Sequence, residues 1–208
     1  MGDVMSKGSM LSKKLAALGL SASAALSGGF LLIPHEGEVK NNKGEHVVYL
    51  DPVGIPTYCW GLTGKDMYGK LPKVGNTYTK QECMTMFTDR VRHFEYVVDK
   101  YAKHGYSSPY QKAGFISFAY NVGEGNYASS TMLRKFNKGD MEGACEELLR
   151  WKYAQGKILS GLVDRRQEEK LWCLGAVNKD VIITFNDIVN IVKDTNELRK
   201  NMQSSVKE

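Results

Sequence analysis

An uncharged apolar segment near the N-terminus constrains this chain more than any other feature. Residues 15–33 contain no charged side chain, and a helix of about 20 residues crosses the hydrocarbon core of a bilayer. The segment holds six Leu, one Phe and one Ile, diluted by five Ala, three Gly and three Ser. Because strongly apolar residues each favour insertion by only about 0.3–0.6 kcal/mol, the margin for insertion is small. We predict a membrane span that can both enter a bilayer and leave it.

The lysines before this segment set its orientation. Lys7, Lys13 and Lys14 precede it, so the positive-inside rule keeps the N-terminus in the cytoplasm and sends the rest of the chain outward. Two alternatives are less favoured. A cleaved signal peptide would use the A-x-A site at 22–24, but its apolar centre, 15–20, would be shorter than usual. A buried helix of a soluble domain would usually carry one polar side.

The remainder has the composition of one ordinary globular unit. The chain has 208 residues, 42% of them apolar and 25% charged, which excludes a fibrous, coiled-coil or disordered protein. The net charge of +5 is not concentrated in a basic stretch, so we expect no nucleic-acid partner. We divide the chain into a signal-anchor segment 1–34, a globular domain 35–175 and a C-terminal extension 176–208. An apolar stripe predicts that the extension is an amphipathic helix docked on the body: Phe185, Ile188, Val189, Val192, Leu198 and Met202.

The domain has the pattern of an α+β fold, a small antiparallel hairpin region followed by a mainly helical lobe. Strands are predicted at 46–50 and 55–60, joined by a type I turn with Asp51 first, Pro52 second and Gly54 fourth. A capping box at Thr79 opens one helix. A second capping box, from Ser108 to Gln111 with Pro109 at the first helical position, opens another helix that ends near Gly123 or Gly125. Further helices are predicted at 130–137, 140–151 and 164–174, the last opened by a capping box from Asp164 to Gln167.

Acid and base chemistry must come from carboxylates or histidine, since the sequence has no phosphate loop, no Gly-x-Ser-x-Gly and no metal-ligand cluster, and its four histidines show no ligand spacing. Glu36, Asp51 and Thr57 stand together around the hairpin. Glycoside hydrolysis needs one protonated carboxyl and one ionised carboxylate. A glutamate entering a helix behind an apolar segment and an aspartate on an exposed turn would supply these two states. The same residues could equally be a helix-dipole acid, a turn aspartate and an ordinary strand threonine.

Five longer motifs identify the chain more specifically. They are His35-Glu36-Gly37, residues 51–64 (DPVGIPTYCWGLTG), residues 117–123 (SFAYNVG), residues 130–133 (STML) and residues 161–168 (GLVDRRQE). In these motifs, and over about residues 10–175, the chain resembles the phage lysozymes of glycoside hydrolase family 24, and more narrowly the endolysins of lambdoid phages with a signal-anchor-release segment.

This resemblance implies a muramidase that cuts the β-1,4 bond between N-acetylmuramic acid and N-acetylglucosamine in peptidoglycan, without a metal or cofactor. It makes Glu36 the general acid, Asp51 the second carboxylate and Thr57 the hydroxyl that helps to hold the attacking water, with inversion as the family's usual outcome. It pairs Arg165 with Glu36 across the lobes. It also places three residues in the wall of the substrate cleft: Tyr120, Asn121 and Thr131.

The sequence departs from the family pattern at several positions. Asp51 follows Glu36 by fifteen residues, an interval six residues longer than usual, with the insertion around 41–46. We expect a hairpin tip to absorb it; otherwise Glu45 would be the acid. Leu62 stands where histidine is common, and Asp164 stands where asparagine is common and should still cap a helix.

The resemblance also implies a phage-encoded, monomeric enzyme that is tethered to the bacterial inner membrane through residues 15–33. It is then released into the periplasm, when the membrane potential collapses, to lyse the host. While the span is inserted, Glu36 stands at most roughly 10 Å from the membrane, so we expect the tethered form to be inactive. Two alternatives remain: a lytic transglycosylase, and a non-catalytic, membrane-anchored peptidoglycan-binding protein.

The cysteines leave their pairing open. Cys59, Cys83, Cys145 and Cys173 allow three pairings, or they can stay free. Residues 1–34 contain no cysteine, so thiol exchange between the anchor and the domain is excluded.

Overall fold

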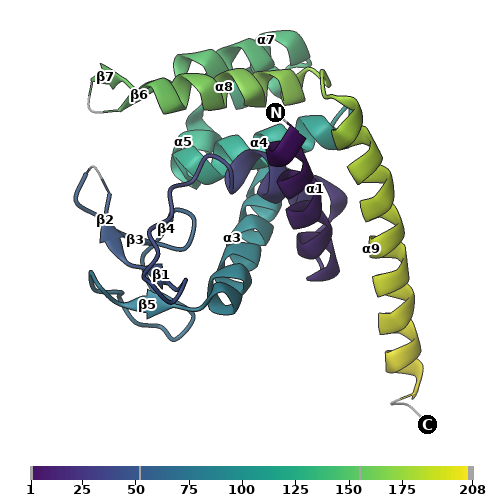
Figure 1. Cartoon of the computed structure of the whole chain (residues 1–208). Coiled ribbons are helices and arrows are strands. Elements are labelled where there is room, and N and C mark those ends of the chain that lie inside the picture. Colours follow the sequence, from purple (N-terminus) through teal and green to yellow (C-terminus); the bar gives the residue numbers. More distant parts are fainter. Residues whose placement is uncertain (1, 52, 155, 206–208) are drawn as a thin grey trace.

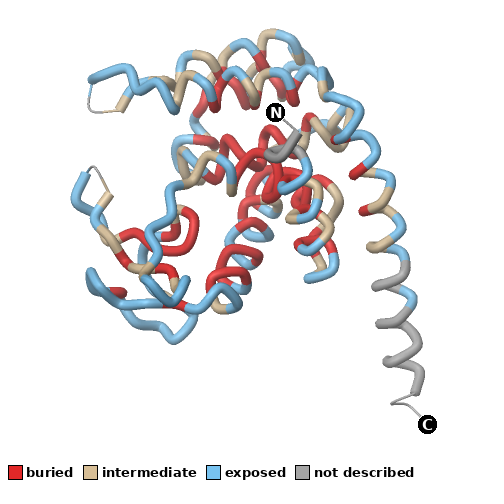
Figure 2. Tube along the Cα trace, viewed as in Figure 1, coloured by how far each residue is buried: buried red, intermediate tan, exposed pale blue. Residues whose placement is uncertain are grey.

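The computed structural model describes residues 2–51, 53–154 and 156–205, and within them the side chains of 6–193 and of Glu197. A helical lobe stands beside a lobe of short antiparallel strands, and the long helix α3 (Lys80–Tyr101) runs between the two (Figure 1). The architecture is α+β and lysozyme-like, as predicted. Buried residues concentrate in α3, in α4 (Pro109–Val122) and in the N-terminal elements packed on α4 (Figure 2).

The apolar N-terminal segment is divided into three helical pieces and does not form one continuous helix in this structure. Helix α1 (Gly2–Ala17) ends before a turn at Gly19, α2 (Ala22–Leu26) begins after the cap Ser21, and the π-helix η1 (Ser27–Leu32) follows. The turn needs glycine because φ at Gly19 is +88°. No helix in the described part of the chain is both long enough and apolar enough to span a membrane.

Five leucines of the segment lie in the protein core. Leu15, Leu20, Leu26, Leu31 and Leu32 are all fully or almost fully buried, and α2 and η1 both pack against α4. Burying a leucine side chain stabilises a fold by about 1.5–3 kcal/mol. The segment therefore supplies a large share of the apolar core of the folded protein.

Small residues allow α1 and η1 to approach closely. A side chain at Gly28 would overlap the Leu15 side chain, and one at Gly29 would overlap Ser12. Glycines that weaken the segment as a predicted membrane span thus allow η1 to pack closely against α1.

The strand lobe contains two small sheets. β2 (Tyr49–Leu50), β3 (Pro56–Tyr58) and β4 (Leu62–Thr63) form an antiparallel meander, and β1 (His46–Val47) pairs with β5 (Thr77–Tyr78). The expected strand 46–50 is therefore split between the sheets. The turn after β2 is closed by the Gly54 N–H donating to the Asp51 carbonyl at 2.9 Å, and Pro52 of the predicted turn lies outside the described residues.

Residues 41–46, the predicted insertion, form a closed turn. Lys40 and His46 form an antiparallel bridge, and within it the Asn41 side chain accepts from the backbone N–H groups of Lys43 and Glu45. The loop thus forms a local turn, as expected for a hairpin tip. Glu45, the alternative acid, accepts a 2.7 Å hydrogen bond from the Asn41 side chain and belongs to this turn.

The helical lobe confirms the local start signals except one. Thr79 forms the predicted capping box with Glu82, and Ser108 caps α4, which ends at Gly123. Short helices follow: α5 (Glu124–Ser129), which the sequence did not predict, α6 (Thr131–Phe136), α7 (Met141–Glu147) and the 3-10 turn η2 (Leu148–Arg150).

The predicted cap at Asp164 is wrong. Helix α8 (Ser160–Cys173) begins four residues earlier, without a side-chain cap, after the hairpin β6 (Tyr153–Ala154) and β7 (Lys157–Ile158). Asp164 and Gln167 are exposed residues inside this helix, so their capping-box spacing is coincidental. A further correction concerns Gln111, whose side chain accepts from the Ser107 N–H and not from the N–H of the cap Ser108.

Two disulfides and a C-terminal helix complete the fold. The bridges are Cys59–Cys83, which ties the strand lobe to α3, and Cys145–Cys173, which ties α7 to α8. Helix α9 (Lys179–Ser205) packs mainly against α1 and α2, so the extension docks as a helix, but mostly on the N-terminal segment and not on the body as predicted. Leu198 and Met202 of its predicted stripe lie outside the residues whose side chains are described.

Candidate active site

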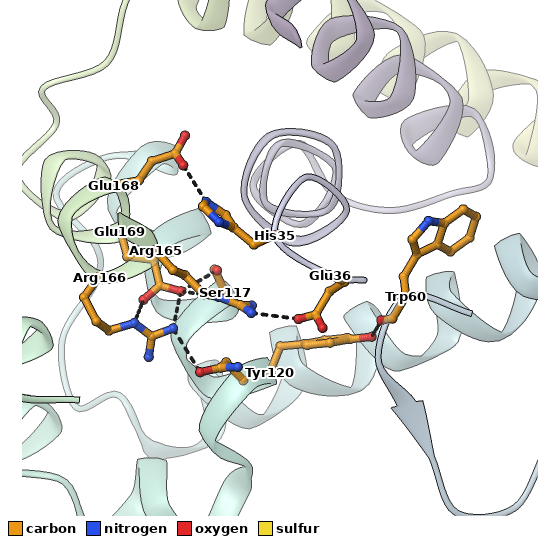
Figure 3. A network of polar contacts seen from close by, with 10 residues as sticks. His35, Glu36, Trp60, Ser117, Tyr120, Arg165, Arg166, Glu168 and Glu169 are labelled. Atoms are coloured by element: carbon orange, nitrogen blue, oxygen red, sulfur yellow. Dashed lines mark hydrogen bonds and ion pairs between the residues drawn. The ribbon is translucent and has the colours of Figure 1, made fainter. Parts of the chain in front are cut away.

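Glu36 lies just beyond the C-terminal end of η1. Its backbone N–H donates to the Leu32 carbonyl at 3.0 Å, so it ends a helical segment and does not enter one, contrary to the sequence-based interpretation. The Glu36 Oε1 atom accepts a 2.7 Å hydrogen bond from Nη1 of Arg165 (Figure 3). Its Oε2 atom lies against Gly61, where any side chain would collide with the carboxyl. The side chain is 15% exposed, so it is held on two sides but still reaches solvent.

Arg165 is part of a buried charge network on α8. Glu169, with no exposed surface, accepts from Nε of Arg165 at 3.2 Å, from Arg166 at 3.0 Å and from the Ser117 hydroxyl at 2.6 Å. Burial lowers the pKa of Arg166 to about 10, although the Glu169 carboxylate opposes the shift. Glu169 therefore holds the Arg165 side chain in one orientation, in which its guanidinium group points toward Glu36.

His35 forms a parallel contact with the same helix. Its Nε2 atom lies 2.6 Å from the Glu168 carboxylate (Figure 3). Two consecutive residues at the exit of the N-terminal segment thus bind consecutive turns of α8, which fixes the chain at Glu36 relative to the helical lobe.

Asp51 and Thr57 lie on the hairpin. Asp51 Oδ1 accepts from the N–H groups of Val53 at 2.9 Å and Ile55 at 2.8 Å, while Oδ2 makes no hydrogen bond within the described part of the chain. Thr57 is buried in β3, and its hydroxyl donates to the Ile55 carbonyl at 3.1 Å. The turn holds Asp51 rigidly, and the Thr57 oxygen keeps its acceptor capacity.

Tyr49 is a residue that the sequence analysis did not select. Its hydroxyl lies 3.4 Å from the position that a side chain on Gly37 would take, and burial raises its pKa, with further contributions from the Glu36 and Asp51 carboxylates. Tyr49 therefore lies close enough to Glu36 and Asp51 for both carboxylate charges to affect its pKa. It precedes Asp51 by two residues, and since residues i and i+2 of a strand share a face, this spacing could have identified it.

The three predicted cleft-wall residues occupy different environments. Tyr120 is buried, and its hydroxyl donates to the Trp60 carbonyl at 3.0 Å, so it joins α4 to the strand lobe from inside. Asn121 is exposed at the end of α4, and its Oδ1 atom accepts from Arg166 at 3.1 Å. Thr131 begins α6 half-buried and accepts from Arg134 at 3.2 Å. Only Asn121 and Thr131 expose a polar side chain.

A buried histidine supports the strand lobe. The His46 ring packs edge-on against Trp60, with ring centroids 4.8 Å apart, and neither ring nitrogen has a hydrogen bond within the described residues. Its Nδ1 atom lies 3.7 Å from the Glu38 carboxylate. Burial lowers its pKa; Glu38 opposes this shift, and Lys40 and Lys80 reinforce it.

A carboxyl held between two lobes by a buried arginine, with a second carboxylate on a hairpin turn, is an arrangement that suits glycoside hydrolysis. The sequence profile of the family described as phage lysozyme matches residues 40–169. A SAR-endolysin of bacteriophage PS119 is 41% identical over 164 residues, which cover 76% of this chain and 95% of that protein.

Solved structures agree with this classification. An endolysin from the Escherichia coli O157:H7 phage FAHEc1 superposes with a TM-score of 0.59 at 26% identity, covering 71% of this chain and 90% of that chain. A variant of P22 lysozyme gives a TM-score of 0.56 at 27% identity, covering 69% and 92%. The chain belongs to the phage lysozyme family. It is a peptidoglycan-degrading lytic enzyme of the glycoside hydrolase type.

Proposed function

We propose that this protein is a muramidase that hydrolyses the β-1,4 bond between N-acetylmuramic acid and N-acetylglucosamine. Glu36 is the general acid, Asp51 is the base that activates water, and Thr57 helps to position that water. The contact between Glu36 and Arg165 carries the proposal, because it fixes a solvent-accessible carboxyl between the two lobes. No metal or cofactor is required for these roles.

The geometry at Glu36 separates the functions of its two oxygens. Oε1 is held by Arg165, so the proton for the leaving oxygen belongs on Oε2, which faces Gly61. Arg165 therefore acts as a positioning residue. Glu45 makes no comparable contact with the helical lobe among the described residues, which favours Glu36 as the acid.

The geometry of the hairpin supports the proposed role of Asp51 as the base. The turn occupies one oxygen of Asp51 and leaves the other to accept a proton from water. Thr57 lies in the strand that pairs with Tyr49, so the water would be held beside Asp51. A single-displacement reaction of this kind requires about 6.5–9.5 Å between the carboxyl groups and inverts the anomeric centre. Asn121 and Thr131 are the proposed glycan contacts. The buried ring of Tyr120 would pack beneath the cleft wall that they form.

Before this reaction, the protein would be tethered to the inner membrane through residues 15–33, with domain 35–175 and extension 176–208 outside, and then released to the periplasm. The relatives named SAR-endolysins support this step, as does the structure of the segment. Its leucines fill the core, and Glu36 follows it by three residues. An inserted segment would leave the core incomplete and keep Glu36 away from Arg165.

Product analysis with the released protein tests the chemistry. Glu36→Gln should abolish the clearing of permeabilised cells, while Glu45→Gln, in the inserted turn, should retain it. Reducing-end products from the wild type indicate hydrolysis. A 1,6-anhydro end would instead indicate a lytic transglycosylase, and glycan binding without cleavage would indicate a non-catalytic binding protein. Sedimentation of the released form tests whether it is a monomer.

A charge in the segment tests the tether. Leu18 is exposed in the turn after α1, so Leu18→Lys should be tolerated in the released fold. Leu18 is the fourth residue of the proposed span, so the same lysine should disfavour insertion by less than the about 2.5–3.5 kcal/mol that a lysine costs at the centre of a span, which is still large against the small margin for insertion. With a cleavable export signal placed ahead of Met1, this variant should be soluble in the periplasm and lyse cells without depolarisation. If the Leu18→Lys protein instead stays in the membrane fraction and remains inactive until depolarisation, the proposed tether is contradicted.

A further inference from the structure

Helix α9 makes its specific contacts with the part of the chain that precedes the apolar segment. The Thr184 hydroxyl lies 2.8 Å from the Ser9 hydroxyl, and the Asp187 carboxylate lies 2.7 Å from Nζ of Lys13. Ser9 and Lys13 both belong to α1. The docked face of α9 therefore recognises α1 through a hydrogen bond and an ion pair.

The burial pattern shows that α9 docks through one face of the helix and exposes the other. Val181, Thr184 and Ile188 are 2%, 1% and 0% exposed, whereas Ile182 and Ile183 on the outer side are 43% and 58% exposed. The Phe185 ring also packs against Tyr110 of α4, with centroids 5.7 Å apart. Helix α9 thus covers α1 and α2 with an apolar strip, and the polar pair at Lys13 and Asp187 lies at its edge.

These contacts are incompatible with an inserted span. In the tethered form proposed above, Ser9 and Lys13 stand on the cytoplasmic side of the membrane, because they precede residue 15. Thr184 and Asp187 stand outside, because they follow the exported domain. The two sets of residues can meet only after α1, with its lysines, has crossed the bilayer completely.

We infer that α9 is an intramolecular latch, which binds α1 after extraction and holds the N-terminal segment out of the membrane. This inference rests on the proposed tether and release. A helix that binds only the extracted state shifts the equilibrium toward that state by its full docking free energy. Re-insertion would require α9 to undock and Lys13 to leave Asp187 before its charge returned through the bilayer. The interaction surface is the face of α1 that carries Ser9 and Lys13.

A cross-link between the two sides reports the docking directly. Because the hydroxyl oxygens of Ser9 and Thr184 are adjacent, cysteines at both positions should be able to form a disulfide, and the four native cysteines are already paired. In cells producing the full-length Ser9→Cys, Thr184→Cys variant, a reducible mobility shift should be absent before depolarisation and present in most of the protein afterwards. The two single variants are the controls.

Separating the same cells into membrane and soluble fractions shows whether a negative result contradicts the latch alone or the tether as well. A cross-link before depolarisation in membrane-bound protein would overturn the latch. A cross-link before depolarisation in soluble protein would overturn the tether itself and the latch with it. Soluble, lytic protein that never cross-links would leave the proposed function intact and overturn the latch alone.

A matched pair of variants on α9 tests the consequence of docking. Ile188→Asp puts a carboxylate into the buried face, and Ile183→Asp makes the same change on the exposed face. When depolarised cells are re-energised, Ile188→Asp should lower the soluble fraction by about tenfold or more, because burying an unpaired carboxylate strongly disfavours docking, whereas Ile183→Asp should match the wild type. Purified Ile188→Asp should still clear permeabilised cells. Equal soluble fractions for the two variants would refute the latch.

Discussion

The buried carboxylate of Glu169 should determine the stability of the helical lobe. It accepts from Arg165, Arg166 and Ser117, and neither it nor Arg166 has any exposed surface. Glu169→Gln would leave two buried guanidinium groups without their shared counter-charge. Removing one partner of a buried ion pair costs about 3–5 kcal/mol. In a protein of this size each kcal/mol lowers the melting temperature by about 2–4 °C, so we expect a loss of about 6–20 °C.

The neighbouring residue provides a matched control. Glu168 carries the same side chain, but it is 40% exposed and pairs with His35, and an exposed pair contributes about 0–1 kcal/mol. Thermal unfolding of the released protein, followed by circular dichroism for wild type, Glu168→Gln and Glu169→Gln, measures the difference. If Glu169→Gln lowers the melting temperature no more than Glu168→Gln does, the reasoning about the buried network is refuted.

Three further predictions follow from single features of the structure. The lowered pKa of His46 means that the unfolded state binds more protons, so stability should fall as the pH drops below 6.5; His46→Phe should flatten this dependence in urea titrations, and an unchanged slope would contradict it. Gly61→Ala should lower kcat by about 100-fold through misplacement of the acid, whereas Gly64→Ala, with the same positive φ but open space around it, should not; equal losses would point to backbone strain alone. Replacing Cys145 and Cys173 together by serine frees a loop of 28 residues and should lower the unfolding free energy by about 3.5 kcal/mol, measured by urea denaturation; a change below 1 kcal/mol would contradict the loop-entropy argument.

Local signals in the sequence predicted local structure well. The capping box at Thr79, the cap at Ser108 and the glycine at 123 lie where α3 and α4 begin or end, because each satisfies backbone groups within a few residues of itself. The same rule failed at Asp164. A capping-box spacing also occurs by chance inside a helix, and the true start of α8 at Ser160 has no capping side chain to announce it.

Long-range features could not be derived in the same way. Which cysteines pair depends on how α7, α8 and the strand lobe fold back on α3, and composition alone left three pairings open. The contact between Glu36 and Arg165 joins residues 129 positions apart; the family resemblance suggested it, whereas no spacing rule could. Tyr49 differs, because a tyrosine in a short strand is ordinary by composition and only its spacing of two residues from Asp51 places it on the same side.

The proposed membrane tether and the observed fold would place compatible demands on the sequence of the apolar segment. A lipid bilayer and a protein core both accept Leu15, Leu26 and Leu31, since both remove apolar surface from water. The difference lies in shape: a span needs only a continuous helix, whereas the core needs a turn at Gly19 and close crossing at Gly28. In the proposed cycle of tether and release, each glycine would lower the affinity for the membrane and improve the fit to the fold, so both effects would favour the released state. The proposed docking of α9 on the extracted α1 would shift the equilibrium in the same direction.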